Sequence, residues 1–182
     1  MFLPRYIHRF FEVAKFKNTN EPLVKKQEIL NGQQLNVKHS FWSSPLFIFS
    51  ILGFFILLVT YKNYKNNTRA KWLDISIFSV TGLTGVLLLL LWFATDHTAT
   101  AYNYNLLWAF VFNLLFIPTL LKKRVKKRFV GYLKFLILMM FLMALHWSTG
   151  VQSFNISLIP IWIAILLRYT FLSHWFGKNL TQ

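Results

Sequence analysis

The residues best suited to chemistry lie in the polar segment between Trp92 and Trp108, which reads WFATDHTATAYNYNLLW. Asp96 is one of only five acidic residues in the chain, and His97 follows it directly. A carboxylate can orient an imidazole and stabilise its charged form, and the imidazole can then move a proton or hold a headgroup phosphate. Neighbouring residues on a helix point about 100° apart, so in a continuous helix Asp96 would pair with His146 more readily than with His97.

The same polar residues also have a purely structural interpretation. Asp96, Asn103 and Asn105 are residue types that cap helix ends and satisfy the free backbone groups there. A metal site built from Asp96, His97 and His146 has no ligand-spacing motif to support it. The chain contains no cysteine, which removes a thiol nucleophile and a cysteine-ligated metal. We therefore predict no metal, no cofactor and no catalytic residue in this sequence.

The elements that must position these residues are membrane helices. The chain is 55% hydrophobic and 19% aromatic, with 20 Phe and 7 Trp in 182 residues, and a soluble domain of this size could not bury that much aromatic surface. The net charge of +15 would suggest nucleic acid in a soluble protein. Here the basic residues cluster beside the apolar runs, where they set orientation and meet anionic lipid headgroups, so we predict no nucleic-acid partner.

Five apolar runs have the length of a membrane-spanning helix, about 20 residues for a hydrocarbon core of about 30 Å. Ser44 can cap the first run, and Pro45 suits its first helical turn. Arg168 interrupts the fifth run and leaves its end open. Small residues at three-residue intervals in the second run would let helix backbones approach closely: Ser76, Ser79, Gly82 and Gly85. The first four expected spans are residues 41–61, 75–95, 102–121 and 129–147. The fifth begins near residue 154 and ends between residues 168 and 175.

Loop charges predict how these spans are oriented. The loops after the first and third spans carry clusters of Lys and Arg, whereas the loops after the second and fourth carry none. The positive-inside rule then gives an all-α membrane protein, a bundle of about five transmembrane helices with the N-terminus outside and the C-terminus inside. The apolar residues of the first 17 positions follow helical spacing, with Lys15 among the charges on the other side, and predict a short amphipathic extracytoplasmic segment.

The domain organisation follows from that orientation. Residues 1–40 hold seven Lys or Arg, which is many for a short exported tail, whereas long translocated domains are largely exempt from the charge rule. We therefore expect residues 1–40 to be an extracytoplasmic juxtamembrane segment that ends a soluble domain absent from this sequence. Residues 41–175 form the five-span domain, and residues 176–182 form a cytoplasmic tail.

One outer face collects most of the polar residues discussed above. In this orientation Asp96 and His97 end the second span, the two asparagines begin the third, and His146 ends the fourth. We predict that this face binds a substrate or docks another domain through Asp96, His97, Asn103, Asn105, Trp108 and His146.

Two strings at this face resemble a known family. The sequence LWFATDHTATAYNYNLLWAF is similar to the transmembrane part of Lnb-like lipoprotein N-acyltransferases of Bacteroidota. The family's aromatic-x-Thr-Asp-His string corresponds to residues 93–97, and its Asn-x-Asn-Leu-Leu-Trp string corresponds to residues 103–108. The N-terminal FLPRYIH and EPLVKKQEIL look like the end of the family's periplasmic domain.

The resemblance implies a multi-pass protein of the bacterial inner membrane that faces the periplasm. The family's enzymes move an acyl chain onto the N-terminal amine of a lipoprotein's lipidated cysteine, and a papain-like domain with a Cys/His pair precedes their helices. For this cysteine-free chain, the resemblance implies only the transmembrane part of such an enzyme. Its implied partners are phospholipid or lipoprotein acyl chains and a catalytic domain supplied in cis or in trans.

Two other functions stay open at this point. The chain could be a non-enzymatic integral membrane anchor or assembly subunit, with capping residues and a partner contact at the outer face. It could also be a small transporter that uses Asp96 and histidines as a proton relay. The transporter is the weakest of the three, because no Asp or Glu is expected at mid-membrane depth, where relays usually lie.

Overall fold

A computed structural model of the chain describes residues 10–11, 13–22, 41–94 and 102–180. The chain divides into two compact units, Met1–Lys38 and His39–Gln182. In the first unit, the backbone N–H of Ala14 donates to the Phe10 carbonyl at 3.1 Å, and Lys15 pairs with Pro22 in an isolated antiparallel bridge. Lys15 therefore lies in a bridge and not on the polar face of a helix, and most of the expected amphipathic segment lies outside the described residues.

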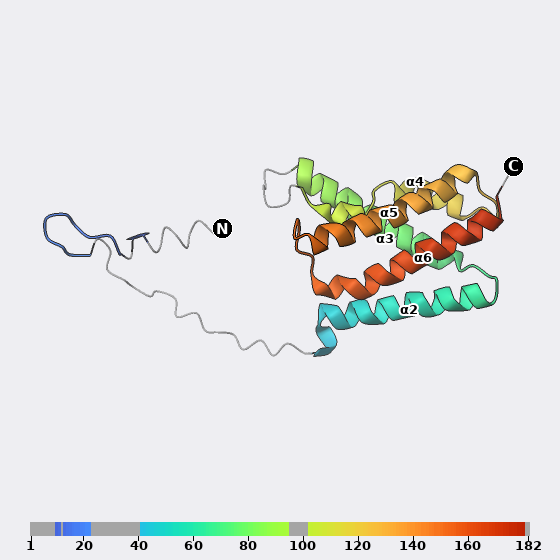
Figure 1. Cartoon of the computed structure of the whole chain (residues 1–182), viewed down its shortest axis with the longest axis horizontal. Helices are drawn as coiled ribbons and strands as arrows, with labels where there is room; N and C mark the ends of the chain where they lie inside the picture. Colours follow the sequence, from blue (N-terminus) through green and yellow to red (C-terminus); the bar gives the residue numbers. More distant parts are fainter. Residues whose placement is uncertain (1–9, 12, 23–40, 95–101, 181–182) are drawn as a thin grey trace. The chain divides into compact units, whose positions relative to one another are not determined.

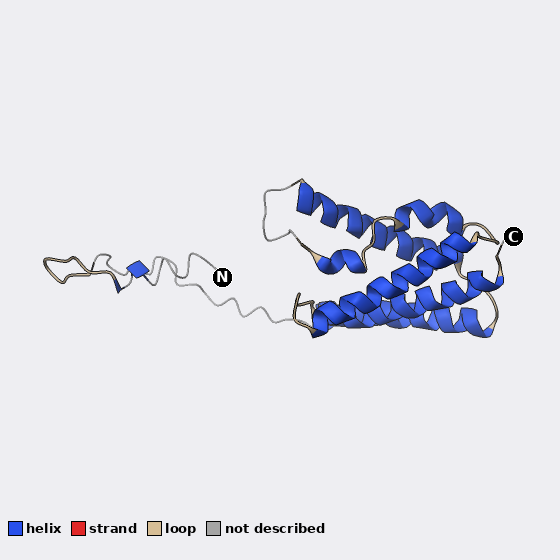
Figure 2. Cartoon of the chain, turned by 45° about the horizontal axis from the view of Figure 1, so that its top comes forward, coloured by secondary structure: helices blue, strands red, loops and turns tan. Residues whose placement is uncertain are grey.

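The second unit is built from helices, and its described residues form no β-strand (Figure 2). Among its described residues, four helices are long and apolar enough to cross a membrane, with η4 counted as the start of α6. The prediction of an all-α bundle of membrane helices is thus confirmed. The α-helices are α2 (Pro45–Lys65), α3 (Lys71–Phe93), α4 (Asn113–Leu120), α5 (Lys127–Ser148) and α6 (Ile159–Lys178), and the short 3-10 helices are η1 (Phe41–Ser43), η3 (Tyr104–Leu107) and η4 (Ile156–Leu158).

The long helices lie side by side, and the chain reverses direction between them, so the bundle has two ends (Figure 1). The main packing pairs are α2 with α6, α5 with α6, and α3 with α4. We call one end the basic end: it holds residues 66–70, residues 121–126 and the last residues of α6. We call the other the motif end: it holds η3, the last turn of α5 and residues 149–155.

Helix α2 begins where the sequence predicts. The Ser44 hydroxyl oxygen accepts a hydrogen bond from the backbone N–H of Phe47 at 3.3 Å, and Pro45 occupies the first helical position. Serine is a favoured N-cap, and proline at the first position has no N–H to leave unsatisfied. The predicted Ser44 cap and the place of Pro45 in the first turn are confirmed, although the helix begins four residues after the expected start of the span.

The third expected span, residues 102–121, is not one continuous helix. Helix η3 and the eight-residue α4 are separated by residues 108–112, which form turns. Irregular backbone at membrane depth is tolerated where protein buries it. Here α3 provides that cover: a Cβ on Gly85 would lie 2.2 Å from the carbonyl oxygen of Ala109, and a Cβ on Gly82 would lie 2.7 Å from the Leu114 side chain.

Helix α6 begins and ends later than the expected fifth span. It begins at Ile159, has Pro160 in its first turn and continues through Arg168 to Lys178. Its close contact with α2 depends on Gly53, where a Cβ would meet the Pro160 carbonyl oxygen at 2.7 Å. Arg168 does not end the helix because its side chain is completely buried among polar partners, described below.

The core contains a polar network as well as apolar side chains. Asn113 is fully buried, and its amide nitrogen donates to the Thr81 hydroxyl at 2.8 Å and reaches the Tyr169 hydroxyl at 3.4 Å. The Tyr132 hydroxyl donates to the Asn113 amide oxygen. The network joins α3, α4, α5 and α6, and it fixes the first residue of α4 beneath the broken segment.

Candidate functional site at the motif end

Three residues of the sequence motif form a hydrogen-bonded ladder. The Asn103 amide oxygen accepts from the backbone N–H of Asn105 at 3.1 Å and from the Asn105 side-chain amide at 2.8 Å. The Asn105 amide oxygen then accepts from the indole N–H of Trp108 at 2.8 Å. The first contact is the local turn that asparagine favours, and it makes Asn103 the cap of η3. The spacing of the motif therefore fixes the position of the Trp108 ring.

Gln152 attaches this ladder to the loop between α5 and η4. Its side-chain oxygen accepts from the backbone N–H of Tyr104 at 2.8 Å, and its side-chain nitrogen donates to the Asn103 amide oxygen at 3.4 Å. Asn103 is thus shared between η3 and residues 149–155. The sequence reasoning missed Gln152, although it is the only amide side chain between the end of α5 and Asn155.

His146, in the last turn of α5, reaches the same place through Tyr104. The two ring centroids lie 4.8 Å apart. The His146 Nδ1 atom lies 2.8 Å from the Leu142 carbonyl oxygen, and because a carbonyl can only accept, Nδ1 carries the proton. In the neutral ring, Nε2 is then an acceptor. No described residue forms a hydrogen bond with Nε2, so it can accept a proton donor from a ligand.

Aromatic and sulfur-containing side chains lie beneath these polar groups. Leu107, Met143 and Phe154 form a small buried cluster, and Trp108 and Trp162 pack against it. The Trp162 indole nitrogen is buried and has no hydrogen-bond partner among the described residues. The motif end therefore combines a few fixed polar groups with an apolar base, as sites for amphipathic ligands do.

The structure describes four of the six predicted site residues. Asn103, Asn105 and Trp108 are joined directly, and His146 joins them through Tyr104. Asp96 and His97 lie outside the described residues, so the expected pairing of Asp96 with His146 stays a prediction.

A second polar cluster, which the sequence reasoning did not identify, is buried near the basic end. The Arg168 Nε and Nη2 atoms both lie 2.7 Å from one carboxylate oxygen of Asp74. The Nη1 atom of Arg168 donates to the Asn63 amide oxygen at 2.9 Å and to the Thr60 hydroxyl at 3.3 Å. Its Nη2 atom donates to the Ala70 carbonyl at 3.3 Å. One side chain thus links α6 to both α2 and α3.

Arg69 completes this cluster from the loop between α2 and α3. Its Nε lies 3.6 Å from the second carboxylate oxygen of Asp74, and its Nη2 donates to the Leu120 carbonyl. Its guanidinium also lies 4.6 Å from the Phe176 ring centroid. Burial lowers the pKa of Arg69 below its ordinary value, while the negative charge of Asp74 opposes that change. Arg69, Asp74 and Arg168 therefore form a buried ionic cluster.

The sequence held a signal for this cluster. Ionisable residues inside membrane segments are rare and usually pair with one another. Arg168 lay in the fifth apolar run, and Asp74 lay one residue before the expected start of the second. Because α3 begins at Lys71, Asp74 falls in the first turn of the helix and becomes the carboxylate that Arg168 requires.

An all-helical unit with four helices of spanning length and a buried ionic cluster between them is a polytopic membrane domain. The family model of the Lnb transmembrane domain matches residues 36–179, and the chain belongs to this family. The resemblance found in the sequence is thereby confirmed. No curated protein and no solved structure matches the chain.

Proposed function

We propose that this chain is the membrane domain of a lipoprotein N-acyltransferase in the bacterial inner membrane. It holds the lipid-modified substrate at the motif end, on the periplasmic side, beside a catalytic domain that this sequence does not contain. Membership of the Lnb transmembrane family is the observation that carries the proposal. The absence of cysteine from the sequence supports the division of labour, since a thiol nucleophile must come from another domain.

Each part of the motif end has a role in this proposal. The apolar base around Trp108 faces acyl chains. The Nε2 atom of His146, with which no described residue forms a hydrogen bond, accepts from an N–H or O–H donor of the substrate's polar head. The ladder from Asn103 to Trp108 holds the tryptophan in one orientation, and its tie to Gln152 keeps η3 against the α5–η4 loop. Asp96 and His97 are proposed to contribute to the same rim.

The test uses the chain together with its cysteine-dependent catalytic domain, in a strain that has no other N-acyltransferase. Mass spectrometry of a reporter lipoprotein's N-terminal peptide measures acylation. His146→Phe keeps a ring beside Tyr104 and removes the acceptor, so it should reduce acylation at least tenfold, the factor that about 1.4 kcal/mol of lost binding gives. Ser148→Ala removes only a hydrogen bond to the Leu145 carbonyl in the same turn and should leave acylation unchanged.

The same assay separates this function from that of a passive anchor. His97→Gln should abolish acylation and Asp96→Asn should reduce it, with both proteins present in the membrane at normal levels. Asparagine caps helices about as well as aspartate, so a purely capping role predicts no loss for Asp96→Asn. Wild-type acylation in all three variants would favour the anchor or assembly subunit.

A further inference from the structure

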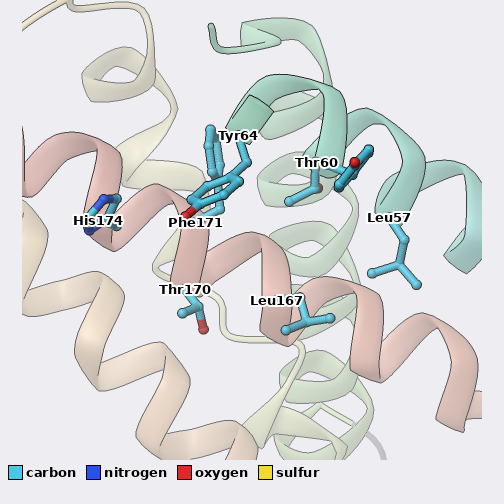
Figure 3. A pocket seen from close by; sticks show the side chains of 8 residues that line it. Leu57, Thr60, Tyr64, Leu167, Thr170, Phe171 and His174 are labelled. Atoms are coloured by element: carbon cyan, nitrogen blue, oxygen red, sulfur yellow. The ribbon is translucent and has the colours of Figure 1, made fainter. Parts of the chain in front are cut away.

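A groove on the bundle surface runs between α2 and α6, from the middle of the unit to the basic end. Its apolar part has a volume of about 580 Å³ and is bordered by Leu57, Thr60 and Tyr64 on α2 and by Leu167, Thr170 and Phe171 on α6. Figure 3 shows these side chains on the two helices that form the groove. Tyr64 is 67% exposed and Leu167 is 47% exposed, so the groove opens to the surface that lipid would cover.

A polar hollow of about 490 Å³ continues this groove toward the helix ends. Both hollows share Tyr64, Phe171 and His174. The polar hollow also has Lys65 on one side and Lys178 on the other, and none of its lining residues is acidic. The combined shape is an apolar groove that leads into a hollow lined by two lysines.

The wall behind the groove adds positive charge. Thr60 accepts a hydrogen bond from Arg168, and the Arg168 guanidinium lies 4.8 Å from the Phe171 ring centroid. The buried ionic cluster holds two cations, Arg69 and Arg168, against one anion, Asp74, which leaves one net positive charge. In a low-dielectric environment such a charge favours an anion nearby.

We propose that this groove is a binding site for an anionic phospholipid, separate from the motif end. The phosphate lies between Lys65 and Lys178, and the first part of one acyl chain lies along the apolar groove. Leu57 and Tyr64 are seven residues apart on α2, which corresponds to about 10 Å, so the groove holds the part of the chain nearest the headgroup. Basic pockets between membrane helices bind anionic headgroups in this way. The proposal does not depend on the proposed acyltransferase function.

The test is a native mass spectrometry titration of the detergent-solubilised full chain with dioleoyl phosphatidylglycerol or dioleoyl phosphatidylcholine. Phosphatidylglycerol should bind more tightly. A lysine near an anionic lipid contributes about fivefold in affinity, so Lys65→Gln with Lys178→Gln should weaken phosphatidylglycerol binding about 25-fold and phosphatidylcholine binding little. Lys122→Gln with Lys123→Gln changes the net charge equally at exposed positions outside the groove and should leave the preference intact.

Two further arms test the acyl part of the site. The Thr170 side chain is exposed, and among the described residues its hydroxyl donates only to the Leu166 carbonyl of its own helix, so Thr170→Trp fills the groove without entering the core. It should weaken binding of both lipids, while circular dichroism stays that of the wild type. Glycerol 1-phosphate at millimolar concentration should not displace the lipid. Displacement by glycerol 1-phosphate, unchanged binding in Thr170→Trp, or equal losses in the two lysine pairs would overturn the proposal.

Discussion

Replacing Arg168 with methionine should destabilise the membrane unit more than any single apolar truncation at its surface. The side chain is 0% exposed and makes hydrogen bonds to Asp74, Thr60, Asn63 and Ala70. Methionine fills similar space but satisfies none of these groups. Of its contacts with described side chains, the Asp74 carboxylate, also 0% exposed, would then keep only the one with Arg69 at 3.6 Å.

The size of the effect follows from what is left unpaired. Removing one partner of a buried ion pair costs about 3–5 kcal/mol, because the remaining charge stays buried without compensation. Asp74→Asn should cost a similar amount, since it leaves Arg69 and Arg168 without a counter-ion. The double variant, Asp74→Asn with Arg168→Met, removes both halves of the pair. Its loss of unfolding free energy should therefore be smaller than the sum of the two single losses by up to about 3 kcal/mol.

Arg168→Lys separates charge from geometry. Lysine keeps the positive charge but has one nitrogen, which cannot reach Asp74, Asn63 and the Ala70 carbonyl together as the guanidinium does. The loss of unfolding free energy in Arg168→Lys should lie between zero and the loss in Arg168→Met. Thr170→Val is the matched control on the same helix, because it removes one intrahelical bond at an exposed position and should change the free energy of unfolding by less than about 0.5 kcal/mol.

The free energy of unfolding is measured by titrating the purified chain in dodecyl maltoside with SDS and following far-UV circular dichroism. If both single variants lose less than about 1 kcal/mol and their effects add in the double variant, the pair does not hold α6 to α3. That result would refute the reasoning even if every variant folds normally.

Four further outcomes are expected. Gly85→Ala should destabilise the unit or lower its yield, because the new Cβ would lie 2.2 Å from the carbonyl oxygen of Ala109; Gly131→Ala, with nothing within 4 Å, should stabilise α5 by about 0.5–1 kcal/mol in the same SDS titration. Asn113→Leu should cost about 1–3 kcal/mol, measured likewise, because three hydroxyl groups lose their shared partner. A single cysteine at Asn67 should be labelled by a membrane-impermeant maleimide only after cells are opened, as the loop charges predict; labelling in intact cells would reverse the orientation.

Features encoded locally were predictable from the sequence. Ser44 and Pro45 are the N-cap and the first residue of α2, and both are recognisable from the sequence. Composition alone indicates a membrane bundle. The motif from Asn103 to Trp108 can be identified as a site candidate from the sequence, because the hydrogen bonds among its side chains join residues at most three positions apart. The link to Gln152 spans 49 positions, and no local pattern indicates it.

Features that depend on distant partners were missed for the same reason. Residues 102–121 are apolar enough to predict one helix, but the break depends on Gly85 of α3 and on the network around Asn113. The hydropathy pattern predicts an interruption at Arg168, because it counts a charge without its partner. The carboxylate that accommodates it lies 94 positions earlier. For the predicted site, Asp96 and His97 remain identified by sequence alone.

The partnership of Arg168 with Asp74 has a consequence for how the chain is made. An arginine at the centre of a single helix opposes its insertion by about 2.5–3.5 kcal/mol. The ribosome delivers α6 after α3, so the carboxylate that offsets this penalty is already in the bilayer when α6 leaves the translocon. Insertion of the later helix is thereby tied to correct placement of the earlier one, and a chain whose α3 fails to insert would present an α6 that the membrane tends to reject.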